Sequence, residues 1–174
     1  MSHAPEPARP AVPEAARVLA LLVRGGATVA TAESLTAGLI GAALTGPPGA
    51  SAAFAGGVLA YATELKHRLL GVPAALLERE GAVHPEVAAA MAGGVRELTG
   101  ATYGVAATGV AGPDPQDGKP VGTVHLAVSG PGERVWHRDL QLRGTREEIR
   151  QWTVNEAIDL LHGVLEPNSG EQSG

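Results

Sequence analysis

The chain has 174 residues, enough for one domain with a sizeable core. It contains no cysteine, which excludes disulfides, thiolate zinc sites and a cysteine nucleophile. Its formal net charge of −5, without a long cluster of Lys or Arg, argues against nucleic acid as a partner. No uncharged apolar run approaches the length of a membrane span, and no secretory signal is recognisable. We therefore expect a cytoplasmic protein without a membrane partner.

Apolar periodicity and turn residues predict alternating helices and strands, followed by hairpins. We expect helices at about 13–24, 36–45, 63–70, 73–80, 85–99 and 145–165. Thr36 and Thr145 can cap the helices that they begin. We expect strands at 27–32, 54–61, 102–108, 121–129 and 134–142. This order predicts an α/β fold, a three-layer α/β/α domain with a mixed sheet. The domain should span 12–166, between disordered segments at 1–11 and 167–174.

Reactive side chains gather at predicted element ends between residues 31 and 66. Ser34 follows the first strand, Ser51 follows a Gly-Pro-Pro-Gly turn, and Tyr61 ends the second strand. Lys66 lies one turn into the next helix, and a buried lysine can act as the base that activates a serine. Spacing alone nevertheless fits a turn serine, a surface lysine and a half-buried tyrosine better than it fits a triad.

A glycine-rich loop follows the predicted strand that ends at Thr108. Its glycines at 109 and 112 free backbone N–H groups that could bind a phosphate, although an ordinary loop with positive φ fits equally well. Arg146, at the start of the last helix, could pair with a phosphate or belong to a solvated face. The histidines lack metal-ligand spacing, so we expect no metal site.

Several ordered segments together resemble a known family. They are T-A-E-S-L-T-A-G (31–38), G-A-S-A-A-F (49–54), Y-A-T-E-L-K (61–66), G-A-V-H-P-E-V (81–87), A-A-T-G-V-A-G-P-D (106–114), K-P-V-G-T-V (119–124) and R-G-T-R-E-E-I-R (143–150). Over residues 12–165 the chain is similar to the CinA C-terminal domain family. Its known activity is the deamidation of nicotinamide mononucleotide to nicotinic acid mononucleotide and ammonia, a step in pyridine nucleotide recycling.

The resemblance implies a site as well as an activity. Ser51 would be the nucleophile, supported by Tyr61 and Lys66, with no metal or cofactor. The substrate pocket would be lined by Ser34, Thr36, Gly38, Thr108, Gly109, Gly112 and Arg146. Backbone N–H groups near the nucleophile would stabilise the oxyanion. Related domains assemble, so we also expect a homo-oligomer.

Three positions depart from the family pattern. Leu35 stands where the first motif often has Cys, Ala37 where it often has Gly, and Ala50 where Ser is frequent. The larger family protein carries a separate N-terminal domain, to which a pyrophosphatase activity is attributed, and we expect this chain to be the stand-alone domain without that activity. The alternative function is a non-catalytic nucleotide-binding module, a competence- or damage-inducible partner protein.

Overall fold

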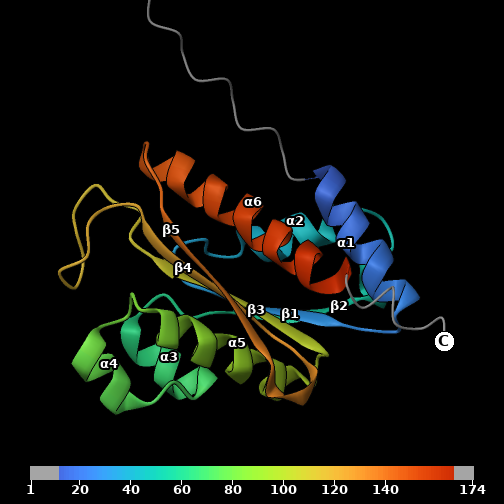
Figure 1. Cartoon of the computed structure of the whole chain (residues 1–174), viewed down its shortest axis with the longest axis horizontal. Coiled ribbons are helices and arrows are strands. Elements are labelled where there is room, and N and C mark those ends of the chain that lie inside the picture. Colours follow the sequence, from blue (N-terminus) through green and yellow to red (C-terminus); the bar gives the residue numbers. More distant parts are fainter. Residues whose placement is uncertain (1–11, 167–174) are drawn as a thin grey trace, which may run out of the picture.

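The computed structural model describes residues 12–166, so the two predicted terminal segments lie outside the described residues. A five-stranded sheet lies between two layers of helices (Figure 1), as the sequence predicted. The strands are β1 (Val29–Glu33), β2 (Phe54–Leu59), β3 (Tyr103–Gly109), β4 (Thr123–Ser129) and β5 (Val135–Gln141). Their order across the sheet is β2-β1-β3-β4-β5.

The helices divide between the two faces of the sheet (Figure 1). One layer contains α1 (Val12–Arg24), α2 (Leu39–Thr45) and α6 (Arg146–Leu165). The other contains α3 (Thr63–Leu70), α4 (Ala74–Glu80) and α5 (Pro85–Thr99). Two short 3₁₀ turns, Ala50–Ala52 and Pro131–Glu133, lie between strands. None of the helices within residues 12–166 is long and apolar enough to cross a membrane.

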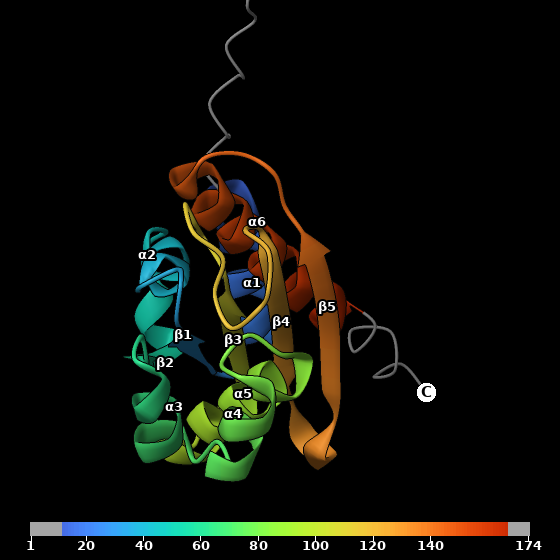
Figure 2. The same cartoon turned by 90° about the vertical axis from the view of Figure 1, so that its left-hand side faces the viewer.

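Strand direction determines which loops meet. β1 pairs in parallel with both β2 and β3, whereas β4 and β5 are antiparallel additions. The carboxyl ends of β1, β2 and β3 therefore lie at one edge of the sheet, which is where α/β proteins usually bind ligands. Figure 2 looks onto this edge, with the β3–β4 loop (yellow) in front of the sheet.

Each face of the sheet has its own apolar core. One core packs α1, α2 and α6 on the sheet through residues such as Leu22, Ile40 and Ile158. The other packs α5 through small residues and Met91. A side chain at Gly104 would collide with the backbone of Ala92, so this glycine allows α5 to lie unusually close to β3. The closeness suits a chain that is only 3% aromatic.

The segment after β1 differs from its prediction. We expected Thr36 to begin the helix, but α2 begins at Leu39, after a turn in which Ala37 (φ 45°) and Gly38 (φ 95°) have left-handed backbones. The Thr36 side chain does not cap the helix, because its hydroxyl is buried without a hydrogen-bond partner. The predicted cap at Thr145 is confirmed: its side chain and that of Glu148 form a reciprocal capping box.

Candidate active site

A lysine and a serine meet at the carboxyl edge of the sheet. Ser34 directly follows β1, and Lys66 lies on α3, on the face that carries α5. Lys66 Nζ is 2.9 Å from Ser34 Oγ. It also donates to the backbone carbonyls of Ala60, at 2.7 Å, and of Tyr61, at 3.3 Å. The lysine is 1% exposed, so these oxygens replace its hydration shell.

Burial lowers the pKa of Lys66 from 10.5 to about 8, and the negative charge of Asp117 opposes this shift. The contacts explain how the neutral amine can act as a base. With two protons left, Nζ can keep donating to the two carbonyls, and its lone pair is then available to accept the proton of the Ser34 hydroxyl. Lys66 can thus activate the Ser34 hydroxyl for attack on a carbonyl carbon.

The turn that carries Ser34 is fixed on several sides. Ser34 N donates to Ala107 O on β3, and Arg150 Nε on α6 donates to Leu35 O. The neighbouring Glu33 is 2% exposed, and its carboxylate accepts the N–H groups of Ile40 and Gly41 at the start of α2. This carboxylate supplies the helix cap that Thr36 was expected to provide. The turn that carries Ser34 is therefore held in place by hydrogen bonds with β3, α2 and α6.

A small pocket of about 80 Å³ opens beside Ser34. It is lined by Ser34, Leu35, Tyr61, residues 109–112, Asp114, Gln116 and Arg146. Arg146 closes one side, because its guanidinium donates to Tyr61 Oη and to Gly112 O. The predicted pocket residues Ser34, Gly109, Gly112 and Arg146 are thus brought together with Tyr61. The β3–β4 loop supplies backbone and carboxylate groups rather than a positively charged wall.

The structure does not bring Ser51 to this site. Ser51 is exposed in the 3₁₀ turn before β2, whereas Tyr61 and Lys66 follow that strand. β2 has six residues, which corresponds to roughly 20 Å at the usual rise of a strand. The expected pairing of Ser51 with Lys66 is therefore not found, and Ser34 takes that place. Parallel strand order could have indicated this, because residues that follow β1 and β2 share one edge of the sheet, whereas Ser51 precedes β2.

Three other predicted site residues, Thr36, Gly38 and Thr108, lie next to the pocket rather than on its wall. Thr108 is 1% exposed, and its hydroxyl donates to Ala82 O at 2.7 Å, so it fixes the loop before α5. Thr36 is fully buried in the turn after Ser34, and Gly38 supplies the left-handed residue before α2. Tyr61 contacts Lys66 through its backbone carbonyl, while its side chain is 60% exposed.

Sequence reasoning missed three polar residues that support the site: Glu33, Asp117 and Arg150. Asp117 accepts the N–H of Ala82 and is the charge that raises the Lys66 pKa. The clearest sequence signal was Glu33, a carboxylate at the end of a short apolar strand. An ionised carboxylate in such a place is buried only when partners surround it. From its position in the sequence Arg150 is typical of a solvated helix face, but its guanidinium donates to Leu35 O.

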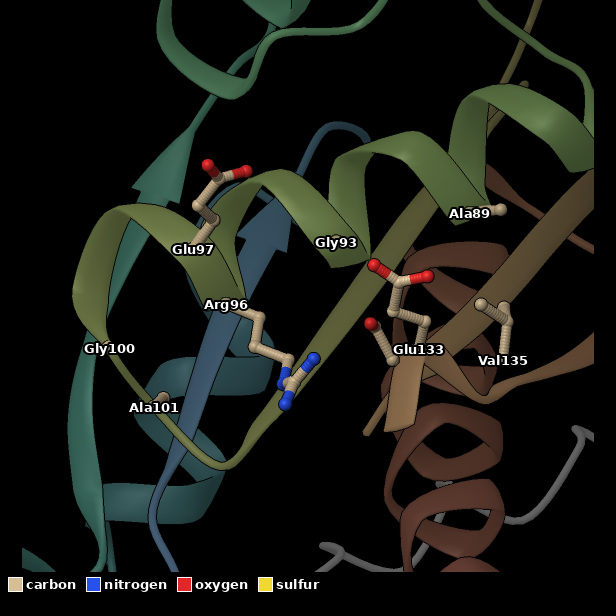
Figure 3. Close-up of a pocket in the computed structure, with 9 residues that line it drawn as sticks. Ala89, Gly93, Arg96, Glu97, Gly100, Ala101, Glu133 and Val135 are labelled. Atoms are coloured by element: carbon tan, nitrogen blue, oxygen red, sulfur yellow. The ribbon is translucent and has the colours of Figure 1, made fainter. Parts of the chain in front are cut away.

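A separate hollow of about 630 Å³ lies at the opposite edge of the sheet. Figure 3 shows Arg96 and Glu97 on α5, with Glu133 and Val135 across from them. It contains none of the predicted site residues. Within residues 12–166, no cluster of His, Asp or Glu side chains could hold a metal ion.

Comparisons with known proteins agree on one family. The family model described as CinA C-terminal domain matches residues 12–165. A CinA-like protein from Frankia casuarinae is 54% identical over 154 residues, which are 87% of this chain and 35% of that protein. A putative competence-damage inducible protein from Desulforamulus reducens is 47% identical over 146 residues, or 84% and 35% of the two chains. The chain thus spans about a third of these curated relatives.

Solved structures extend the comparison to the fold. The crystal structure of the competence/damage inducible protein CihA from Agrobacterium tumefaciens is 37% identical with a TM-score of 0.86, covering 95% of this chain and 99% of that one. A CinA superfamily protein from Klebsiella pneumoniae is 30% identical at the same TM-score, covering 90% and 98% of the two chains. The sequence segments, the fold and these relatives lead to one conclusion: the chain belongs to the CinA C-terminal domain family.

Proposed function

We propose that this domain is an amidohydrolase that converts nicotinamide mononucleotide to nicotinic acid mononucleotide and ammonia, with Ser34 as the nucleophile and Lys66 as its base. The observation that carries the proposal is the contact of 2.9 Å between buried Lys66 Nζ and Ser34 Oγ at the mouth of a small pocket. The choice of substrate follows from the family resemblance, and its biological setting would be pyridine nucleotide recycling in the cytoplasm.

The proposed reaction has two halves. Ser34 Oγ attacks the carboxamide carbon while its proton passes to neutral Lys66 Nζ. The C–N bond then breaks, Lys66 returns the proton to the leaving nitrogen, and ammonia departs from a nicotinoyl ester on Ser34. A water molecule, deprotonated by Lys66, attacks the ester carbon, and the protonated lysine returns its proton to Ser34 Oγ. The net result is that water replaces the amide nitrogen.

Two backbone groups suit the developing oxyanion. The N–H groups of Leu35 and Thr36 directly follow the nucleophile and have no hydrogen-bond partner in the described part of the chain. Donors just after a nucleophile on a sharp strand-to-helix turn are a recurrent way of stabilising a tetrahedral intermediate. Side-chain identity matters little for this task, so Leu35 in place of the frequent Cys is compatible with it.

The test is ammonia release from nicotinamide mononucleotide by purified protein in the presence of a chelator. Wild type should turn over. Ser34→Ala should lose about 10³-fold or more, because the nucleophile and its base act in one covalent step. Ser51→Ala is the matched control, a serine removed from an element end outside the site, and should stay within about twofold of wild type.

Three outcomes would change the assignment. If Ser51→Ala is inactive and Ser34→Ala is active, the nucleophile belongs at Ser51 as the sequence first indicated. If turnover disappears with the chelator and returns with a metal, the serine mechanism is wrong. If folded wild type binds the nucleotide but releases no ammonia, the domain is a binding module.

A further inference from the structure

A second hollow adjoins the proposed active site, and Arg146 lines both. This hollow has a volume of about 390 Å³, and its wall also includes Leu39, Glu147, Arg150 and Gln151. The small pocket beside Ser34, at about 80 Å³, is far below the roughly 300 Å³ at which ligand pockets begin. A substrate larger than its reacting carboxamide must therefore extend past Arg146.

The second hollow presents two cations. Arg146 and Arg150 are one turn apart on α6, so they lie on one face of the helix. Arg146 donates to Tyr61 Oη and Gly112 O, and Arg150 donates to Leu35 O, all of them uncharged oxygens. Neither guanidinium forms a salt bridge among residues 12–166. Each keeps further N–H donors for a planar or tetrahedral anion.

We propose that this hollow is the subsite for the substrate phosphate, which Arg146 and Arg150 bind together. The inference rests on the proposed function and deepens it, because it places the anionic end of the mononucleotide. Arg146 lines both hollows, so a phosphate bound by its remaining N–H groups lies next to the small pocket beside Ser34. Glu147, the carboxylate on the same wall, is exposed and stays hydrated.

Arg150 also links the proposed phosphate subsite to the turn that carries Ser34. Its guanidinium holds the carbonyl of Leu35, the residue that follows Ser34. A phosphate bound to the remaining N–H groups of Arg150 would fix the orientation of that guanidinium and, through it, the nucleophile turn. Binding energy from a remote group can in this way raise kcat instead of only lowering KM. Arg150 is then a positioning residue as well as a phosphate ligand.

The decisive measurement compares nicotinamide mononucleotide with nicotinamide riboside, which lacks the phosphate. In Arg150→Gln the ratio of the two kcat/KM values should fall by about 10- to 100-fold, because the variant loses charge-assisted hydrogen bonds to phosphate. Loss of the Leu35 contact alone would lower both values equally and leave the ratio unchanged. Arg17→Gln, which removes an exposed arginine of α1, is the control for net charge and should leave the ratio unchanged.

Added phosphite tests the coupling in a second way. It should raise riboside turnover by wild type and have no such effect in Arg150→Gln, with chloride at equal ionic strength as the control. Inorganic phosphate should also raise the melting temperature of wild type more than that of Arg150→Gln, whether or not the protein turns over.

These readouts separate the two proposals. An unchanged ratio in Arg150→Gln, with an equal response of both proteins to phosphate, overturns the phosphate subsite even if the mononucleotide is hydrolysed. Absence of ammonia release from either substrate overturns the proposed function, and the difference in melting temperature then decides the subsite alone.

Discussion

Lys66 Nζ and Ser34 Oγ lie 2.9 Å apart although 32 residues separate them in the chain. The contact exists because β1 and β2 run in parallel, so the residues after each strand emerge at the same edge of the sheet. α3 then carries Lys66 back beneath that edge. The pair is thus a product of strand topology, and its chemistry depends on how deeply the fold buries the lysine.

The first prediction concerns the pH dependence of activity. A lysine acts as a base only when it is neutral, and burial lowers the pKa of Lys66, the proposed base, to about 8. We expect kcat/KM for ammonia release to rise with pH and to level off above about pH 8. Lys66→Met, which keeps an unbranched side chain, should lose about 10³-fold or more at every pH. A profile that is flat from pH 6 to 9 would contradict Lys66 as the base.

The same group predicts how stability depends on pH. The unfolded chain holds a proton on Lys66 up to about pH 10.5, whereas the folded chain loses it at about pH 8. Between these values the unfolded state binds more protons, so the free energy of unfolding should rise with pH, by about 3 kcal/mol in total. Urea denaturation from pH 7.5 to 10.5 measures this rise. Lys66→Met should lack it, and equal slopes for the two proteins would refute the buried, neutral lysine.

Asp117 provides a finer test of the site electrostatics. Its charge raises the pKa of Lys66 against the effect of burial, while its side chain accepts the N–H of Ala82. Asp117→Asn keeps an acceptor oxygen but removes the charge, so the acid limb of the kcat/KM profile should move to lower pH. Asp114→Asn, on the same loop, is a control for a carboxylate that lines the pocket. A shift of the acid limb to higher pH in Asp117→Asn would contradict the conclusion that the charge of Asp117 raises the pKa of Lys66.

Glu33 should contribute to stability through the start of α2. Its carboxylate accepts two backbone N–H groups and the hydroxyl of Thr31 while remaining 2% exposed. Glu33→Ala leaves those donors without a partner, so the free energy of unfolding should fall by about 1–3 kcal/mol. Glu33→Gln keeps one acceptor oxygen and should fall less. Chemical denaturation measures both, and equal stability of wild type and Glu33→Ala would exclude the capping role.

Ala37 should be a site of strain. Its φ of 45° is left-handed, a conformation that costs a residue with a Cβ roughly 1–2 kcal/mol. Ala37→Gly should therefore raise the free energy of unfolding by up to about 1 kcal/mol, after the greater entropy of unfolded glycine is subtracted. Ala42→Gly is the matched control, because Ala42 is exposed within α2 and the same change there should cost about 1 kcal/mol. If both variants are destabilised alike, the turn is not strained.

Sequence patterns predicted the fold well because its elements carry strong local signals. Thr145 and Glu148 form a capping box that indicates the start of α6 from four residues. The site was harder to predict than the fold. Ser34 and Ser51 both follow turn or strand signals, and these signals do not indicate which edge of the sheet each serine occupies. Periodicity also gave no sign that Ala37 and Gly38 form a left-handed turn, so the helix was placed too early.

The arrangement around Lys66 bears on whether the proposed serine–lysine site can be transferred to another protein. Apart from Ser34, the atoms that hold the ammonium group are main-chain carbonyls of residues 60 and 61, so no substitution of those side chains removes them directly. The reacting pair itself consists of two side chains, Ser34 and Lys66. The harder requirement is the path of the chain from β2 into α3, because that path aims both carbonyls at one amine.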